Sequence, residues 1–147
     1  MNAKPSERRK ARRLLIQALY QWGMSGAQPQ EIELQFLAEQ DVKGADMTYF
    51  QECLREIVTQ RDELDDALKP CMHLKIDEVD PVELAVLRLA CYEMKVRIDI
   101  PYKVVINEAL EQAKTFGATD GHKFVNGVLD KLARQLRATE INAARKS

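Results

Sequence analysis

The stretch "DEVDPVELAVLRLACYEM", residues 77–94, decides the fold. Asp80 can cap a helix with its side chain, Pro81 suits the first helical position, and Glu83 completes a capping-box pattern. From residue 82 to residue 94 the apolar side chains then recur on nearly every side of the helix. A helix that is apolar all round is normally buried at the centre of a domain. The sequence therefore predicts a central helix with the other elements packed around it.

Helical patterns also fill the sequence on both sides of this stretch. We expect six or seven helices and no strand. Those around the central helix lie within residues 6–22, 31–39, 47–68, 98–117 and 121–136. Ser6 is the expected cap of the first helix, Pro70 ends the third, and Thr119 or Asp120 caps the last.

These helices predict an all-α fold of two packed three-helix subdomains within a single domain of 147 residues. The lobes are expected at about residues 1–70 and 71–137, with a frayed tail over 138–147. Hydrophobic residues make up 46% and charged residues 31%, which is typical of a soluble globular protein. No apolar run approaches the roughly 20 residues that span a bilayer. We therefore interpret the protein as cytoplasmic.

The sequence offers little for catalysis or metal binding. There are three cysteines without a CxxC pair, and the two histidines, His73 and His122, are far apart. The phosphate-binding loops GxGxxG and GxxxxGK[ST] are absent, as is the nucleophile motif GxSxG. Cys91 falls in the buried helix, where a thiol normally serves packing. We expect no enzymatic activity, no cofactor and no metal.

The net charge of −1 conceals a strong segregation of charge along the chain. Residues 1–13 carry six cations and one acid, residues 31–66 carry eleven acids and three cations, and the last 27 residues carry six cations and two acids. Such a protein can bind a polyanion on one face and a basic protein on another. The alternative is that the segregation only follows the solvated faces of helices.

The first helix, "SERRKARRLLIQALYQW", places cations on an exposed face. At about 100° per residue, Arg9 and Arg13 lie opposite the apolar stripe, Arg8 and Arg12 lie on its flank, and Tyr20 projects on the side of Arg9. Guanidinium groups suit phosphate oxygens, and an exposed ring suits a base or a protein partner. Cations at a helix N-terminus oppose the helix dipole, so this arrangement favours a negatively charged partner over a merely solvated helix end.

A second candidate site is the stretch "TDGHKFVNGVLDK", residues 119–131. Lys123 and Phe124 follow Asp120 at a helix N-terminus, where backbone N–H groups favour anions. Together with His122, these three side chains can hold a phosphate and stack a base, although Phe124 is equally well explained as a peripheral core residue. Gly127 costs about 1 kcal/mol relative to alanine inside a helix, which suggests the close approach of another helix or chain.

A third candidate is the acidic stretch "IDEVDPVE", residues 76–83. Asp77 and Glu83 belong to a cluster that can dock a basic protein. Helix capping explains Asp80 and Glu83 equally well, so the residues alone leave both interpretations open.

Taken together, these stretches resemble the NusB family of bacterial transcription antitermination factors. The resemblance covers nearly the whole chain and rests on "RRKAR" with "QALYQW", on "FLAEQDVKGAD", on "AVLRLACYE", on "IPYKVVINEALEQAKTFG" and, most specifically, on "HKFVNGVLDK". A weaker resemblance links the same helices to the N-terminal part of certain ribosomal RNA cytosine methyltransferases, but no glycine-rich cofactor loop is present.

The resemblance implies a helical protein without catalytic activity. It implies binding of single-stranded boxA RNA in nascent transcripts together with NusE, a small-subunit ribosomal protein, within a complex that helps RNA polymerase resist termination, notably on ribosomal RNA operons. The implied RNA contacts are Arg8, Arg9, Arg12, Asp120, Lys123 and Phe124. The implied NusE contacts are Tyr20, Asp77 and Glu83.

Two other hypotheses compete with this one. The protein can be an adaptor or a homodimer that uses the basic helix only to dock an acidic protein. Alternatively, it can be a cysteine-dependent enzyme, which requires a reactive thiol.

Overall fold

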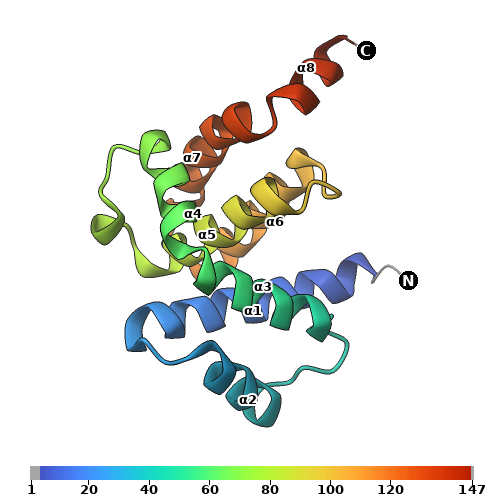
Figure 1. Ribbon diagram of the computed structural model, residues 1–147, viewed down its shortest axis with the longest axis vertical. Helices are drawn as coiled ribbons and strands as arrows, with labels where there is room; N and C mark the ends of the chain where they lie inside the picture. Colours follow the sequence, from blue (N-terminus) through green and yellow to red (C-terminus); the bar gives the residue numbers. More distant parts are fainter. Residues whose placement is uncertain (1–3, 147) are drawn as a thin grey trace.

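The computed structural model describes residues 4–146. These residues form eight α-helices and two short 3-10 turns, and no strand is found among them (Figure 1). The elements are α1 (Pro5–Ser25), α2 (Pro29–Glu39), α3 (Met47–Thr59), α4 (Arg61–Leu68), η1 (Lys69–Cys71), η2 (Ile76–Glu78), α5 (Pro81–Val96), α6 (Tyr102–Phe116), α7 (Gly121–Leu136) and α8 (Ala138–Lys146). The predicted all-α fold is confirmed, with one helix more than the upper expectation.

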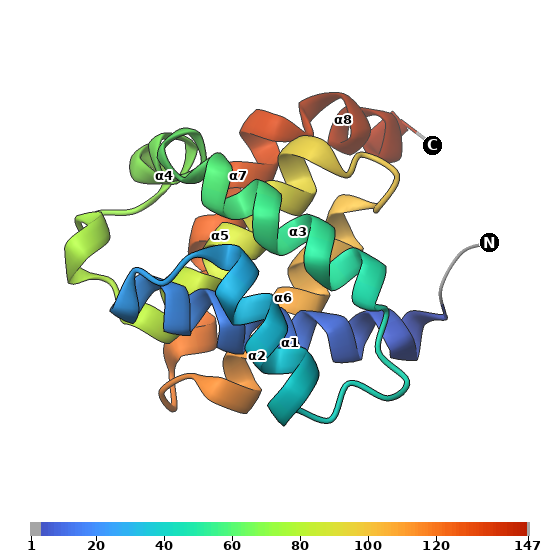
Figure 2. The same ribbon diagram turned by 60° about the horizontal axis from the view of Figure 1, so that its bottom comes forward.

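Helix α5 lies at the centre of the molecule, as predicted. The helices α1, α3, α4, α6 and α7 all contact it, and Figure 2 shows it enclosed among them. Every residue of α5 from Ala85 to Met94 is buried. The Asp80 carboxylate caps α5 by accepting hydrogen bonds from the backbone N–H groups of Val82 at 2.9 Å and Glu83 at 3.2 Å.

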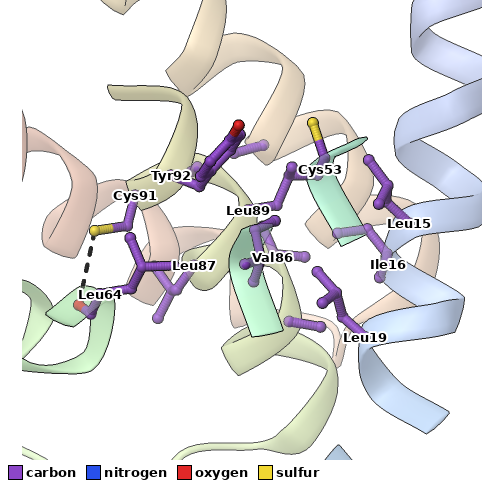
Figure 3. Packing of buried hydrophobic residues seen from close by; sticks show 14 of the residues in the cluster. Leu15, Ile16, Leu19, Cys53, Leu64, Val86, Leu87, Leu89, Cys91 and Tyr92 are labelled. Carbon is purple, nitrogen blue, oxygen red and sulfur yellow. Dashed lines mark hydrogen bonds between the residues drawn. The ribbon is translucent and has the colours of Figure 1, made fainter. Parts of the chain in front are cut away.

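The core is one continuous cluster that several helices share. Figure 3 shows Leu15 and Leu19 of α1 facing Val86 of α5, with Leu64 of α4 on the opposite side. Complete burial of such an aliphatic side chain stabilises the fold by about 1.5–3 kcal/mol. Because both halves of the chain contribute to this cluster, the packing ties them together, and the division into two lobes near residue 70 stays a prediction.

The long helix predicted over residues 47–68 is wrong in one respect. The chain bends at Gln60, whose φ of −97° and ψ of 14° interrupt the helix between α3 and α4. Helix α3 packs on α1 and α5, whereas α4 packs on α5 and α7. Because of the bend, the apolar face of this sequence packs on α1 at one end and on α7 at the other.

Two helix ends also differ from the sequence-based expectation. Pro5 occupies the first position of α1, so the cap position falls on Lys4 and not on Ser6. The tail, predicted to be frayed, instead forms α8. The Glu140 carboxylate anchors α8 because it accepts hydrogen bonds from the Tyr102 backbone N–H at 2.9 Å and from Arg137 Nη1 at 2.6 Å.

Among residues 4–146, no helix combines the length and the apolar character that crossing a bilayer requires.

Candidate nucleic-acid interface

Arg9 lies on the surface of α1, where the sequence predicted it, and α6 holds its guanidinium. Arg9 Nε donates to Glu108 Oε2 at 3.0 Å, and Arg9 Nη2 donates to Glu108 Oε1 at 2.8 Å. The side chain of Arg9 is 52% exposed, while that of Glu108 is only 10% exposed. The hydrogen bonds to Glu108 raise the pKa of the Arg9 guanidinium. Arg9 is thus a charged group fixed at the surface.

Arg8 lies at the edge of the core, beside the end of α5. Its guanidinium lies 4.2 Å from the centre of the Tyr49 ring, and its Nη2 lies 3.7 Å from Asp46 Oδ2. The guanidinium of Arg97 lies 5.0 Å from the same ring. A guanidinium over a tyrosine face is a favourable cation–π arrangement. Part of the predicted cation face is therefore engaged in packing the first turns of α1.

Arg12 departs most from the prediction, which placed it on the flank of the apolar stripe and among the RNA contacts. Its side chain is only 5% exposed, and its Nη2 lies 2.9 Å from Glu93 Oε2 of the central helix. The hydroxyl of Tyr49 donates a hydrogen bond to the same carboxylate. Arg12 therefore balances a buried acid, and it presents no guanidinium at the surface.

The start of α7 is much more open. Lys123 Nζ lies 3.3 Å from Asp120 Oδ1, and the two side chains are 72% and 74% exposed. Asp120 holds the cap position of α7, but its side chain accepts no capping hydrogen bond, contrary to the prediction. Phe124 is half-buried and meets the His73 ring edge to face, with 6.5 Å between ring centres. The cation and the ring are both accessible.

The structure does not bring the two predicted RNA-contacting segments together in one pocket. Gly121 at the start of α7 packs on Glu83 in the first turn of α5, whereas Arg12 pairs with Glu93 near the other end of α5. Helix α5 has 16 residues, which gives it a length of about 24 Å. A single ligand that contacts both segments must be extended.

The predicted protein-contact residues gather near Tyr20. This ring is 41% exposed and shares a groove of about 200 Å³ with Asp77, Val79 and Leu84. It also borders a larger groove of about 530 Å³ between α1, α2 and the end of α6. The exposed Tyr20 ring and the exposed Asp77 therefore line the same groove, which a shared contact with one protein partner requires.

Glu83 does not lie on an open acidic surface. It is only 8% exposed, and burial raises the pKa of its carboxyl group. A Cβ atom added to Gly121 would stand 2.9 Å from Glu83 Cδ, so the absence of a side chain at Gly121 lets α7 approach this carboxylate. Glu83 thus lies between the predicted protein-contact surface and the start of α7.

Two further expectations can be compared with the structure. Apart from the neighbouring backbone of α7, nothing among residues 4–146 lies within 4 Å of a Cβ added to Gly127, so the predicted approach of another helix is wrong and the approach of another chain stays a prediction. The three cysteines are buried, and burial raises the pKa of the Cys91 thiol to about 12. A thiol in this state is a poor nucleophile. No cluster of three potential metal ligands occurs among residues 4–146.

Sequence reasoning missed Glu108, Lys114 and Arg97. Glu108 and Lys114 line a groove beside Arg9, and Arg97 lies over Tyr49. Arg9 and Glu108 are 99 positions apart, so no periodic pattern within one helix reveals their contact. The sequence signal that was available was Glu93, a carboxylate in an otherwise apolar buried helix, because such an acid requires a buried cation.

The fold and the surface define a class of protein: a small all-helical domain built on a central buried helix, with exposed cations and exposed acids at separate places. Residues 9–134 match the model of the NusB family. The chain therefore belongs to the NusB family.

Relatives agree with this assignment. The chain is 56% identical over 140 residues to the transcription antitermination protein NusB of Pseudomonas savastanoi pv. phaseolicola, which covers 95% of this chain and 85% of the relative. It is 56% identical over 134 residues to the protein of the same name from Shewanella halifaxensis, covering 91% and 99% of the two chains.

Solved structures agree as well. A T. maritima NusB structure superposes with a TM-score of 0.76 at 30% identity and covers 90% of this chain and 93% of that chain. A structure described as the antitermination factors NusB and NusE in complex with dsRNA superposes with a TM-score of 0.79 at 26% identity, covering 90% and 99%.

Proposed function

We propose that this protein is a transcription antitermination factor that binds boxA-like RNA of nascent transcripts jointly with NusE. The proposal places it in the cytoplasm, without catalytic activity, in a complex that helps RNA polymerase resist termination on ribosomal RNA operons. The observation that carries the proposal is family membership over residues 9–134, supported by the similarity to a NusB structure that contains NusE and RNA.

In this proposal the RNA runs between the two cationic segments. Arg9 and Lys123 are the exposed cations that contact phosphates, with Arg8 at the edge and Asp120 beside Lys123. Phe124 offers a ring against which a splayed base can stack, since single-stranded RNA is read mainly in this way. Arg12 supports the site from the core, because its guanidinium is buried.

The protein partner occupies the other surface. Tyr20 provides an exposed aromatic anchor and Asp77 an exposed carboxylate in the same groove, a combination that suits a basic ribosomal protein. Glu83 is buried beneath this surface, and its side chain packs the first turn of α5 against Gly121 of α7. The RNA and protein surfaces are thus adjacent at the start of α7 and distinct elsewhere.

Fluorescence anisotropy with a labelled boxA-like RNA tests the proposal. A scrambled RNA of equal length and a duplex of the same sequence serve as controls, each with and without purified NusE. We expect tighter binding of the boxA-like single strand and a further gain in affinity with NusE. Equal, weak binding of all three RNAs that NusE leaves unchanged would contradict the proposal and favour the adaptor or homodimer hypothesis.

Two variants separate the surfaces in the same assay. Phe124→Ala is expected to weaken the boxA-like RNA by about fivefold to a hundredfold, the worth of one stacked base, and the scrambled RNA much less. Tyr20→Ala is the matched aromatic control: it should leave binding of RNA alone unchanged and reduce the gain from NusE. Equal losses on both RNAs for Phe124→Ala would remove the stacking role.

A further inference from the structure

We infer that Glu108 is a positioning residue for RNA binding, which holds the guanidinium of Arg9 ready for a phosphate. The inference rests on the proposed RNA contact of Arg9 and assigns a role to a residue of α6 that does not touch the RNA. The carboxylate of Glu108 stands between two guanidiniums: Arg9 binds it from the surface, and Arg12 Nη1 lies 4.0 Å away on the core side.

The contact with Glu108 leaves the phosphate-binding end of Arg9 free. Glu108 receives its hydrogen bonds from Nε and Nη2, which form one edge of the guanidinium. A guanidinium has five N–H donors in a fixed plane, so the donors of Nη1 and the second donor of Nη2 remain for a ligand. Because the Arg9 side chain is 52% exposed, these donors can bind a phosphate while Nε and Nη2 keep their hydrogen bonds to Glu108.

Holding the side chain in advance favours binding. A long arginine loses rotamer freedom when it binds a phosphate, and a side chain that is already fixed loses less. Glu108 is itself fixed, since its side chain is 10% exposed and it belongs to a chain of contacts through Arg12 and Glu93 to Tyr49. The buried partners thus transmit the rigidity of the core to a surface arginine.

The surroundings of Arg9 have room for an RNA backbone. A groove of about 430 Å³ between α1 and α6 is lined by Arg9, Asn107, Glu108, Glu111 and Lys114. Lys114 adds a second cation further along α6, in the direction of the loop that leads to α7. The groove beside Arg9 thus carries a second cation, Lys114, toward the end of α6 that precedes α7.

Glu108→Gln tests the inference, because positioning and plain electrostatics predict opposite signs. Removal of a negative charge beside a polyanion raises affinity if charge alone matters. If Glu108 positions Arg9, the substitution weakens binding of the boxA-like RNA by about fivefold, the cost of ordering one long side chain on binding. Glu111→Gln is the matched control, since Glu111 is exposed, lines the same groove and carries the same charge. It should leave affinity unchanged or slightly higher.

A double-variant cycle shows whether Glu108 acts through Arg9. Arg9→Ala weakens binding, and adding Glu108→Gln to Arg9→Ala should cause no further loss. Two outcomes would overturn the role of Glu108 while leaving the proposed RNA contact of Arg9 intact. One is wild-type or higher RNA affinity for Glu108→Gln, and the other is a loss of affinity from Glu108→Gln that persists when Arg9 is alanine. If Arg9→Ala binds as the wild type does, the proposed contact of Arg9 fails and the inference fails with it.

Arg9→Lys gives a second test that leaves the Glu108 carboxylate itself in place. Lysine keeps the positive charge but lacks the planar fork that binds Glu108 and a phosphate at once. We expect a loss similar to that of Glu108→Gln, and wild-type affinity would contradict the inference. Thermal unfolding of each variant, followed by far-ultraviolet circular dichroism, confirms that the compared proteins are folded.

Discussion

The first turns of α1 and the first turns of α7 look alike in the sequence and differ in the structure. Both are basic helix starts that were predicted to bind RNA. In α1, Arg9 and Arg12 are each bound to a carboxylate of another helix, and Arg8 packs on Tyr49. Among residues 4–146, the exposed Lys123 of α7 forms an ion pair only with Asp120 of the same turn.

The difference shows where the cost of cations at a helix N-terminus is offset. Such cations oppose the helix dipole and therefore require a compensating negative charge. From the sequence alone, an external ligand is the expected source of that charge. For Arg9 and Arg12 the fold itself supplies it through Glu108 and Glu93, 99 and 81 positions away. The basic run of α1 is thus partly a structural element, whereas the cation of α7 remains available.

Arg12→Ala should produce the largest effect on stability. The substitution leaves the Glu93 carboxylate buried without its guanidinium, and breaking a buried pair in this way costs about 3–5 kcal/mol. The free energy of unfolding, measured by urea titration at pH 7, should fall by this amount. Arg13→Ala, one position further on the exposed side of α1, is the control and should change it by less than about 0.5 kcal/mol. Equal small effects would mean that α1 carries only surface cations.

Tyr49→Phe should have the next largest effect. It keeps the ring on which Arg8 packs and removes the hydroxyl that donates to Glu93. Loss of a buried hydrogen bond to a charged group costs about 1.5–3 kcal/mol. Tyr20→Phe is the control, because the Tyr20 ring is exposed and the substitution should be neutral. A neutral result for Tyr49→Phe would show that Arg12 alone satisfies the buried carboxylate.

The sequence predicted most of the fold because the decisive signals are local. The cap at Asp80, the proline at position 81 and the apolar surface of α5 all lie within one stretch, and each is confirmed. The bend at Gln60 and the anchoring of α8 were not predictable in this way. Both depend on contacts with helices that are distant in sequence. Helix α4 packs on α5 and α7, and the Glu140 carboxylate of α8 accepts a hydrogen bond from the backbone of Tyr102.

The candidate site was predicted less completely, for the same physical reason. The exposure of Arg9 and Tyr20 follows from helical periodicity and is found in the structure. Periodicity within one helix cannot show which charged residues beside the apolar stripe another helix covers, so it does not reveal that Arg12 and Glu83 are buried. Their burial depends on partners that only the folded chain brings near, Glu93 in one case and Gly121 in the other.

Gly127→Ala should stabilise α7. The exposed glycine has a helical backbone and open space around it, so alanine fits without strain. We expect the free energy of unfolding to rise by about 0.5–1 kcal/mol, because alanine loses less backbone entropy on folding. Gly26→Ala is the opposite control. Gly26 has a φ of 70°, which alanine adopts only with strain, so this substitution should lower the free energy of unfolding. A loss of stability for Gly127→Ala would indicate that another chain packs on this surface.

Lys123→Ala should have the smallest effect on stability and a clear effect on RNA binding. The substitution removes an exposed pair with Asp120, worth at most a few tenths of a kcal/mol, and it also removes a cation that opposes the dipole of α7. These two small terms have opposite signs, so the free energy of unfolding should change by less than about 0.5 kcal/mol. The salt dependence of RNA binding reports the lost phosphate contact instead: the slope of log K against log salt should become shallower by about 0.7 for a single strand. An unchanged slope together with unchanged stability would show that the open cation of α7 does not contact RNA, and it would assign phosphate binding to the fixed arginine of α1.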